Sequence, residues 1–303
     1  MTRSSRLVAQ NKRCPWFLGC VPRAFVAAIV TLPCALPSTT KADDRQYAIV
    51  ARVGAKNEGL TLGEVVIKVG SASVRATAIK ASPETPRNVA IVVDAGPDQG
   101  RVLSREKALA VALINELSDA GTSFTIARAA ISPKTEEPTL DRRLAIEHIR
   151  DLAGDSGEKR NVAVYDALGS AIRQVSLIPG LGVIIFIGEG NDGGSSLRYA
   201  ELRSLAESNH IACFAALIAD HSLRGTKSIL RYGWNLRELV GDTAGIFLEN
   251  PKTQNATRRL SESVRRLRLI AFEIPFHPSG RYKISVSSFR GKGLLAQNSI
   301  LIP

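Results

Sequence analysis

The feature that most constrains this chain is an unbroken apolar run, Val89 to Val93, that ends on Asp94 and is soon followed by Gly96-Pro97. Strands that are apolar throughout, without alternation, are typically buried on both faces of a parallel sheet. Open α/β sheets hold their ligands at the carboxyl ends of such strands. Asp94 is therefore a candidate functional residue, and the ordinary alternative is that it caps the turn.

From Val89 onward, apolar strands alternate with segments whose apolar residues recur at helical spacing. The predicted strands are Val89–Val93, Ser123–Ala130, Leu181–Ile187, Ile211–Ile218 and Gly245–Leu248. The predicted helices are Arg101–Leu117, Asp141–Leu152, Val162–Val175, Leu197–Ser208, Asn235–Val240 and Thr257–Leu267. This alternation predicts an α/β fold: a doubly wound, mostly parallel sheet with helices on both faces and right-handed crossovers.

Short strand patterns flank this region on both sides. They are Tyr47–Val53, Glu64–Val69 and Val74–Ile79 before it, and Leu269–Ile274, Tyr282–Phe289 and Leu294–Ile302 after it. Three short strands alone do not make a stable, covered sheet. We therefore expect the N- and C-terminal segments to pack together as a small accessory β unit. The predicted division is a leader at 1–42, β segments at 43–86 and 269–303, and the α/β domain at 87–268.

The leader has the pattern of a signal peptide. Basic residues precede an apolar core, Ala24 to Leu36, and Thr40-Lys41-Ala42 offers small residues for cleavage before Asp43. We expect a periplasmic or extracellular protein, with an uncleaved leader that acts as a membrane anchor as the alternative. Six of the 40 basic residues and none of the 28 acidic residues lie in 1–42, so the remainder carries a net charge of only +6. That balance gives no reason to expect nucleic acid as a partner.

Cysteine and histidine usage gives no sign of a disulfide framework or a metal site. Cys213 is the only cysteine after the leader, and its apolar surroundings predict a buried core residue. The four histidines are far apart and lack ligand spacing: His148, His210, His221 and His277.

Several phrases in the expected order resemble a known family. They are Gly59-Leu-Thr-Leu-Gly-Glu-Val-Val-Ile-Lys-Val-Gly70, the strand ending at Asp94, Val162-Ala-Val-Tyr-Asp-Ala-Leu168, Ile184-Ile-Phe-Ile-Gly-Glu189 and Leu236-Arg-Glu-Leu-Val-Gly-Asp-Thr-Ala-Gly-Ile-Phe247. Over residues 47 to 290 the chain resembles bacterial von Willebrand factor A-type (vWA) proteins of the secreted "VWFA-related" group. The joint order of these phrases is far more specific than any single one.

The resemblance implies a metal-ion-dependent adhesion site, usually for Mg²⁺, built from five oxygen-bearing residues. Asp94 matches the first, but the other four positions hold Gly96, Asp98, Val162 and Gly188. Because three of the five lack an oxygen side chain, we expect the metal site to be non-functional and no cofactor to bind. The alternative is a rearranged Mg²⁺ site through Asp94 and Asp98, with Glu189 or Asp192 added. We expect an unknown protein partner to face the loops that carry Asp94, Gly96, Asp98, Val162, Gly188, Glu189 and Asp192.

The sequence gives less support to an enzymatic function. Gly188-Glu-Gly-Asn-Asp-Gly193 follows the dinucleotide pattern G-x-G-x-x-G, with Asp220 further on, but it lies late in the sheet and not immediately before a helix. The carboxylate pairs Asp94/Asp98 and Glu189/Asp192 could serve a hydrolase. No nucleophile motif accompanies them, and we therefore expect a non-enzymatic interaction module.

The last predicted helix of the α/β region is basic. Its arginines are Arg258, Arg259, Arg265, Arg266 and Arg268. Such a cluster is usually a solvated face, and the alternative is contact of helix 257–268 with an acidic partner or an anionic membrane surface.

Overall fold

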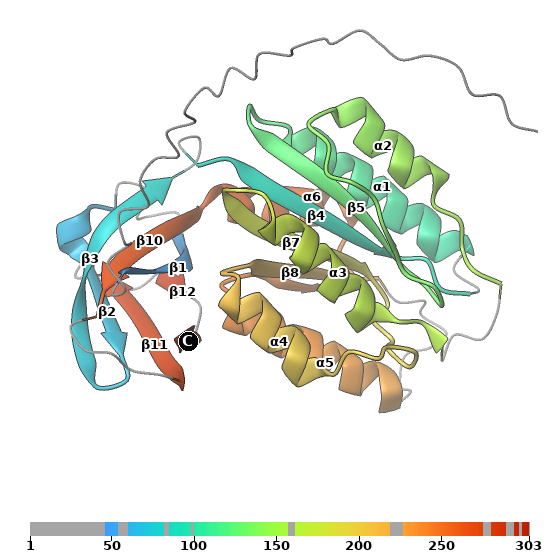
Figure 1. Ribbon diagram of the computed structural model, residues 1–303. Helices are drawn as coiled ribbons and strands as arrows, with labels where there is room; N and C mark the ends of the chain where they lie inside the picture. The colour runs from blue at the N-terminus through green and yellow to red at the C-terminus, as the bar shows by residue number, and fades with distance from the viewer. Residues whose placement is uncertain are drawn as a thin grey trace, which may run out of the picture. The chain divides into compact units, whose positions relative to one another are not determined.

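The computed structural model describes residues 46–53, 60–81, 85–97, 100–156, 161–218, 227–274, 280–288, 294–296 and 299–302. The predicted leader, Asp98, Asp220, His221 and His277 lie outside these ranges. The described chain contains two sheets (Figure 1).

The first sheet has six strands in the order β6-β5-β4-β7-β8-β9. Its strands are β4 (Arg87–Asp94), β5 (Thr122–Ala129), β6 (Lys134–Thr135), β7 (Leu181–Gly188), β8 (Ala212–Leu217) and β9 (Phe247–Glu249). All neighbouring pairs are parallel except β5 and β6. Every residue of the two central strands, β4 and β7, is buried, as their apolar runs predict.

Helices cover both faces of this sheet (Figure 1). They are α1 (Gly100–Leu117), α2 (Arg142–Asp151), α3 (Val164–Ser176), α4 (Tyr199–Ser208), α5 (Lys227–Asp242) and α6 (Thr253–Arg265). Val89, Ile91 and Val93 pack against α1, α2 and α6, whereas Ala90 and Val92 pack against α3, α4 and α5. The predicted fold class is thus confirmed. None of the helices in the described ranges is long and apolar enough to cross a lipid bilayer.

The second sheet is antiparallel and takes strands from both ends of the chain, in the order β12-β1-β10-β3-β2-β11-β13. Its elements are β1 (Gln46–Val53), the 3-10 turn η2 (Leu62–Glu64), β2 (Val65–Val69), β3 (Ala72–Ala81), β10 (Leu267–Glu273), β11 (Gly280–Ser288), β12 (Leu294–Ala296) and β13 (Ser299–Ile302). Ile49, Ile67, Phe272 and Ile284 are fully or almost fully buried in its core. This sheet is the accessory β unit.

The order of strands in the accessory unit differs from a simple meander. β2 and β3 form a hairpin through Gly70, whose φ of 60° suits the turn, but β1 pairs with β10 and β12 instead of β2. The chain enters β10 directly after α6, and the N–H of Val53 donates to the carbonyl of Arg266. β10 pairs with β1 on one side and with β3 on the other.

Three further elements differ from the sequence predictions. The predicted strand Leu294–Ile302 is two short strands that lie on opposite edges of the sheet. The helix expected at Asn235 begins at Lys227. Between the predicted strand Ser123–Ala130 and the predicted helix Asp141–Leu152, where the sequence predicts neither helix nor strand, the edge strand β6 pairs with β5 despite the neighbouring Pro133. All three depend on long-range pairing or on weak local patterns.

Candidate functional site

The carboxylate of Asp94 joins two loops at the carboxyl edge of the six-stranded sheet. Its Oδ1 accepts a hydrogen bond from the N–H of Gly96 at 3.1 Å. Its Oδ2 accepts from the N–H groups of Glu189 at 3.2 Å and Gly190 at 3.3 Å. Asp94 therefore caps its own turn, as the ordinary reading of the sequence has it, and also ties the β4–α1 turn to the end of β7.

The residues around Asp94 leave no space for larger side chains. A Cβ at Gly188 would lie 2.1 Å from the Cβ of Asp94, and a Cβ at Gly96 would lie 2.8 Å from Cγ2 of Val162. Val162 is 3% exposed. Its carbonyl accepts hydrogen bonds from the N–H groups of Gly193 and Gly194. These positions therefore serve close packing, and none of the three side chains offers an oxygen.

Asp192 caps a helix from a distant loop. The N-cap position of α3 is Ala163, which has no side-chain acceptor. Oδ1 of Asp192 takes that role by accepting the N–H of Tyr165 at 3.2 Å, and it also accepts the hydroxyl of Ser195. Burial raises the pKa of Asp192, while these hydrogen bonds oppose the rise. The carboxylate thus belongs to the helix start.

Asp166 also links α3 to the β7–α4 loop, but here the carboxylate lies on the helix and the donors lie on the loop. It lies in the first turn of α3 and accepts the backbone N–H groups of Ser196 at 2.9 Å and Leu197 at 2.8 Å. Together, Asp166 and Asp192 fasten the β7–α4 loop to the start of α3. The acidic residues of this edge therefore hold its loops in place.

A second buried carboxylate, that of Glu106 on α1, interacts with the charge of Asp94. Glu106 is fully buried, and within the described ranges neither of its oxygens has a hydrogen-bond partner. Burial raises its pKa well above the usual value, and the nearby Asp94 and Glu189 raise it further. Sequence reasoning missed Glu106, although its spacing from Val102 and Leu109 places it on the apolar face of α1.

Asp94 titrates unusually for the same reason. Burial raises its pKa to about 6, the N–H of Gly96 opposes the rise, and the carboxylate of Glu189 adds to it. Glu189 itself is only 2% exposed. The charges of the buried acids Asp94, Glu106 and Glu189 thus act on one another at this edge.

The predicted site residues in the described ranges lie at this one edge: Asp94, Gly96, Val162, Gly188, Glu189 and Asp192. Asp98 lies outside the described residues. Where the chain is described, no three His, Cys, Asp or Glu side chains are grouped so that they could hold a metal ion.

The glycine-rich stretch is not arranged as a phosphate-binding loop. The N–H of Gly190 donates to Asp94, and those of Gly193 and Gly194 donate to Val162. A dinucleotide site needs such amides free for the pyrophosphate, at the start of a helix. Here α4 begins only at Tyr199.

About half of the basic cluster contributes to packing within the fold. Arg265 lies 3.7 Å from Glu116 and 3.8 Å from Asp119, and Arg268 donates to backbone carbonyls. Arg258 and Arg259 are exposed on α6. Arg266 lies 4.0 Å from Glu262. Arg258 and Arg259 are therefore the clearest candidates for contact with an anionic surface.

Gly188→Ala should destabilise the protein because the new Cβ would collide with Asp94. We expect the free energy of unfolding to fall by about 2 kcal/mol or more, as in other overpacked sites. Gly63→Ala is the matched control, since a Cβ there meets nothing within 4 Å. Urea unfolding measures both variants, and equal stabilities would contradict the packing described here.

Asp94→Asn should remove a pH dependence of stability. The pKa of Asp94 is about 6 in the folded protein against 3.8 ordinarily, so the folded state binds this proton more tightly. Protonated Asp94 therefore adds about 3 kcal/mol to the free energy of unfolding below pH 4. This contribution is lost as the pH rises through about 6.

Urea unfolding of both proteins between pH 4 and pH 7 measures this contribution. The wild type should lose more stability over that range than Asp94→Asn does. An identical slope in the two proteins would show that Asp94 keeps its ordinary pKa.

Comparisons with known proteins bear on the fold. No protein-family model and no curated protein matches the chain. Among solved structures it is similar to a von Willebrand factor type A protein from Catenulispora acidiphila, at 12% identity over 85% of this chain and 72% of that one, with a TM-score of 0.47. It is also similar to the conserved hypothetical protein BatB from Bacteroides thetaiotaomicron, at 18% identity over 58% of this chain and 96% of that one, with a TM-score of 0.46.

A third similar structure is proximal thread matrix protein 1 from the mussel byssus, at 13% identity over 64% of this chain and 50% of that one, with a TM-score of 0.50. At such identities the likeness concerns the fold alone. It agrees with the order and direction of the strands and with helices on both faces. The resemblance noted in the sequence is thus confirmed at the level of the fold: the six-stranded sheet and its helices have a vWA-like fold.

Proposed function

We propose that this chain is an exported, non-enzymatic interaction module that binds a protein partner through the carboxyl-edge loops, without a bridging metal ion. The observation that carries the proposal is the engagement of Asp94. Both of its oxygens accept backbone N–H groups of its own loops, and the adjacent glycines allow no added side chain.

The residues present fit Mg²⁺ poorly. Mg²⁺ requires near-octahedral coordination by oxygen ligands. At this edge Gly96, Val162 and Gly188 supply no side-chain oxygen. The alternative of a rearranged site would draw on Asp192, but that carboxylate caps α3. If Asp192 bound a metal ion, α3 would lose the hydrogen bond that caps its first turn.

Uncharged side chains are exposed in the described part of this edge. Ile131 is 37% exposed at the end of β5, and Ser132, Asn161 and Ser196 are also exposed. Two of these positions are held by hydrogen bonds to side chains: the N–H of Ile131 donates to Asp155 at 2.8 Å, and the N–H of Ser196 donates to Asp166 at 2.9 Å. Such pre-ordered loops lose little conformational entropy on binding. This favours recognition of a protein surface.

The same hydrogen bonds argue against catalysis by the acidic residues. Asp94 and Asp192 are bound to backbone donors, and Glu106 and Glu189 are buried. General acid–base chemistry needs carboxylates that reach a substrate. The acids of this edge are instead consistent with a structural role.

Export rests on the leader alone, which lies outside the described residues. The proposal retains a periplasmic or extracellular location. It also retains, as a subsidiary prediction, contact of Arg258 and Arg259 with an anionic membrane surface.

The test is crosslinked capture from the envelope of the source cells with tagged protein as bait. We expect the same partner to be captured with and without EDTA. Asn161→Arg, which places a charge on the exposed edge, should reduce capture about tenfold or more. Asn255→Arg, on an exposed part of α6, is the matched control and should leave capture unchanged.

Two results would contradict the proposal. Loss of capture in EDTA would show that a metal ion takes part. Equal loss in Asn161→Arg and Asn255→Arg would show that the carboxyl edge is not the binding surface.

A further inference from the structure

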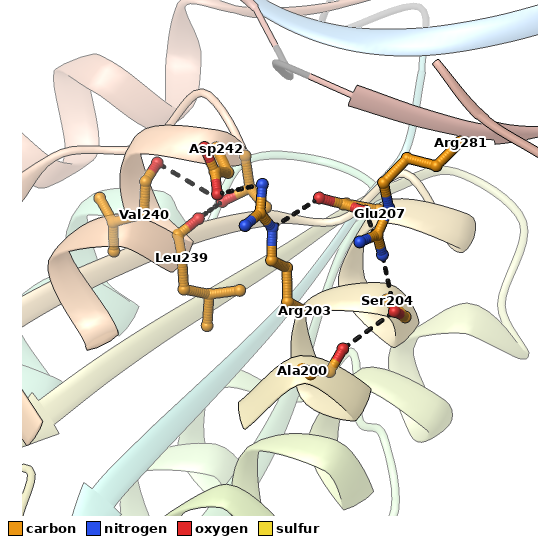
Figure 2. Close-up of polar contacts among 9 residues, drawn as sticks. Ala200, Arg203, Ser204, Glu207, Leu239, Val240, Asp242 and Arg281 are labelled. Carbon is orange, nitrogen blue, oxygen red and sulfur yellow. Dashed lines mark hydrogen bonds and ion pairs between the residues drawn. The ribbon is translucent and has the colours of Figure 1, made fainter. Parts of the chain in front are cut away.

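A buried glutamate on α4 contacts an arginine of the accessory sheet (Figure 2). Glu207 is fully buried, and its Oε2 lies 3.0 Å from Nη2 of Arg281 on β11. The same nitrogen of Arg281 donates to Oγ of Ser204 at 2.7 Å. One arginine side chain thus connects the accessory sheet to two positions on one helix.

Two further charges complete the cluster (Figure 2). Nε of Arg203 donates to Oε1 of Glu207 at 2.9 Å, and its Nη2 lies 2.9 Å from Oδ2 of Asp242. Two arginines therefore balance two carboxylates. Glu207 would keep Arg203 as a partner if Arg281 moved away, so release of Arg281 leaves no isolated buried charge.

The chain crosses between the two sheets at neighbouring points. One crossing leads from Ala81 of β3 to Arg87 of β4, and the other leads from α6 through Arg266 to β10. Ala81 is the paired neighbour of Arg268 in the accessory sheet. The end of β3 and the start of β10 therefore lie side by side.

Apolar packing and hydrogen bonds also join the β1–β10 side of the accessory sheet to the six-stranded sheet and its loops. Val50 and Leu267 belong to the core of the six-stranded sheet. Arg52 donates to the carbonyls of Ala244 at 3.0 Å and Gly245 at 3.2 Å. The β1–β10 side of the accessory sheet is therefore fixed by covalent, apolar and polar links.

The opposite side of the accessory sheet is attached differently. β11 is separated from β10 by β3 and β2. Arg281 is 43% exposed, so water and salt reach its ion pair with Glu207. α4 also lies against β13, the strand paired with β11, so the ion pair acts together with backbone packing on this side. A firm joint on the β1–β10 side and a contact with α4 that includes a solvent-accessible ion pair form the two elements of a hinged closure.

We propose that Glu207 and Arg281 form a latch that holds the β11 side of the accessory sheet against α4. When the latch opens, Arg281 passes into water, Glu207 stays paired with Arg203, and the accessory sheet pivots about the β1–β10 side. Because the ion pair is accessible to salt, ionic strength sets the balance between the closed and open forms.

Hydrogen exchange of the full chain tests the latch. Arg281→Met should make backbone amides of β11 and of the C-terminal half of α4 exchange about fivefold faster or more, because the closed form is lost. Amides of β4 and β7 should be unchanged. Lys283→Met is the matched control, since Lys283 is exposed on the same strand, and it should exchange as the wild type does.

Salt provides a second readout. Raising NaCl to about 0.5 M should speed exchange at β11 and α4 in the wild type but not in Arg281→Met, since screening acts on the ion pair. Unchanged exchange in Arg281→Met would overturn the latch. Equally faster exchange in β4 and β7 would also overturn it, because that pattern reports global destabilisation.

Discussion

The arrangement of the carboxyl edge depends on one buried interaction: the carboxylate of Asp94 with three backbone N–H groups. A buried carboxylate is costly unless donors surround it, and these donors come from two different loops. The β4–α1 turn and the end of β7 are therefore held at a fixed distance. Gly188 and Gly96 follow from this constraint, because any side chain there would meet Asp94 or Val162.

Other carboxylates at this edge also accept backbone N–H groups and thereby hold loops in place. Asp192 and Asp166 exchange hydrogen bonds between the β7–α4 loop and α3, and Asp155 holds the end of β5. In the family that the sequence resembles, oxygen side chains at this edge are expected to bind a metal ion. In this chain Asp94, Asp155, Asp166 and Asp192 accept hydrogen bonds from backbone amides. The vWA-like fold thus keeps ordered loops by hydrogen bonding, which is the physical basis of the proposed metal-free interaction.

Much of the fold could be predicted because its signals are local. The apolar run before Asp94 and the helical spacing after it identify β4 and α1, and Asp141 caps α2 where the sequence predicts a helix start. Sequence could not show that β10 lies between β1 and β3, because strand order follows from pairing between distant segments. It also placed Leu294–Ile302 in one strand, although β12 and β13 pair with different strands at opposite edges.

The candidate site was only partly predictable for the same reason. A strand end located Asp94 and the family resemblance located Gly188, but nothing local shows that Asp192 caps α3 or that Asp94 accepts from Gly190. Glu106 had a local signal, since it shares a helical face with Leu109, but a charged residue is rarely fully buried. The carboxylates that raise its pKa, Asp94 and Glu189, come from two other parts of the chain.

The central claim is that the acids of the carboxyl edge serve the fold and leave no metal site. Calorimetric titration of the purified protein with Mg²⁺ and Mn²⁺ tests it most directly. The account predicts no binding tighter than about 100 μM, since Gly96, Val162 and Gly188 supply no side-chain oxygen. Binding tighter than that, abolished by Asp94→Ala, would contradict it.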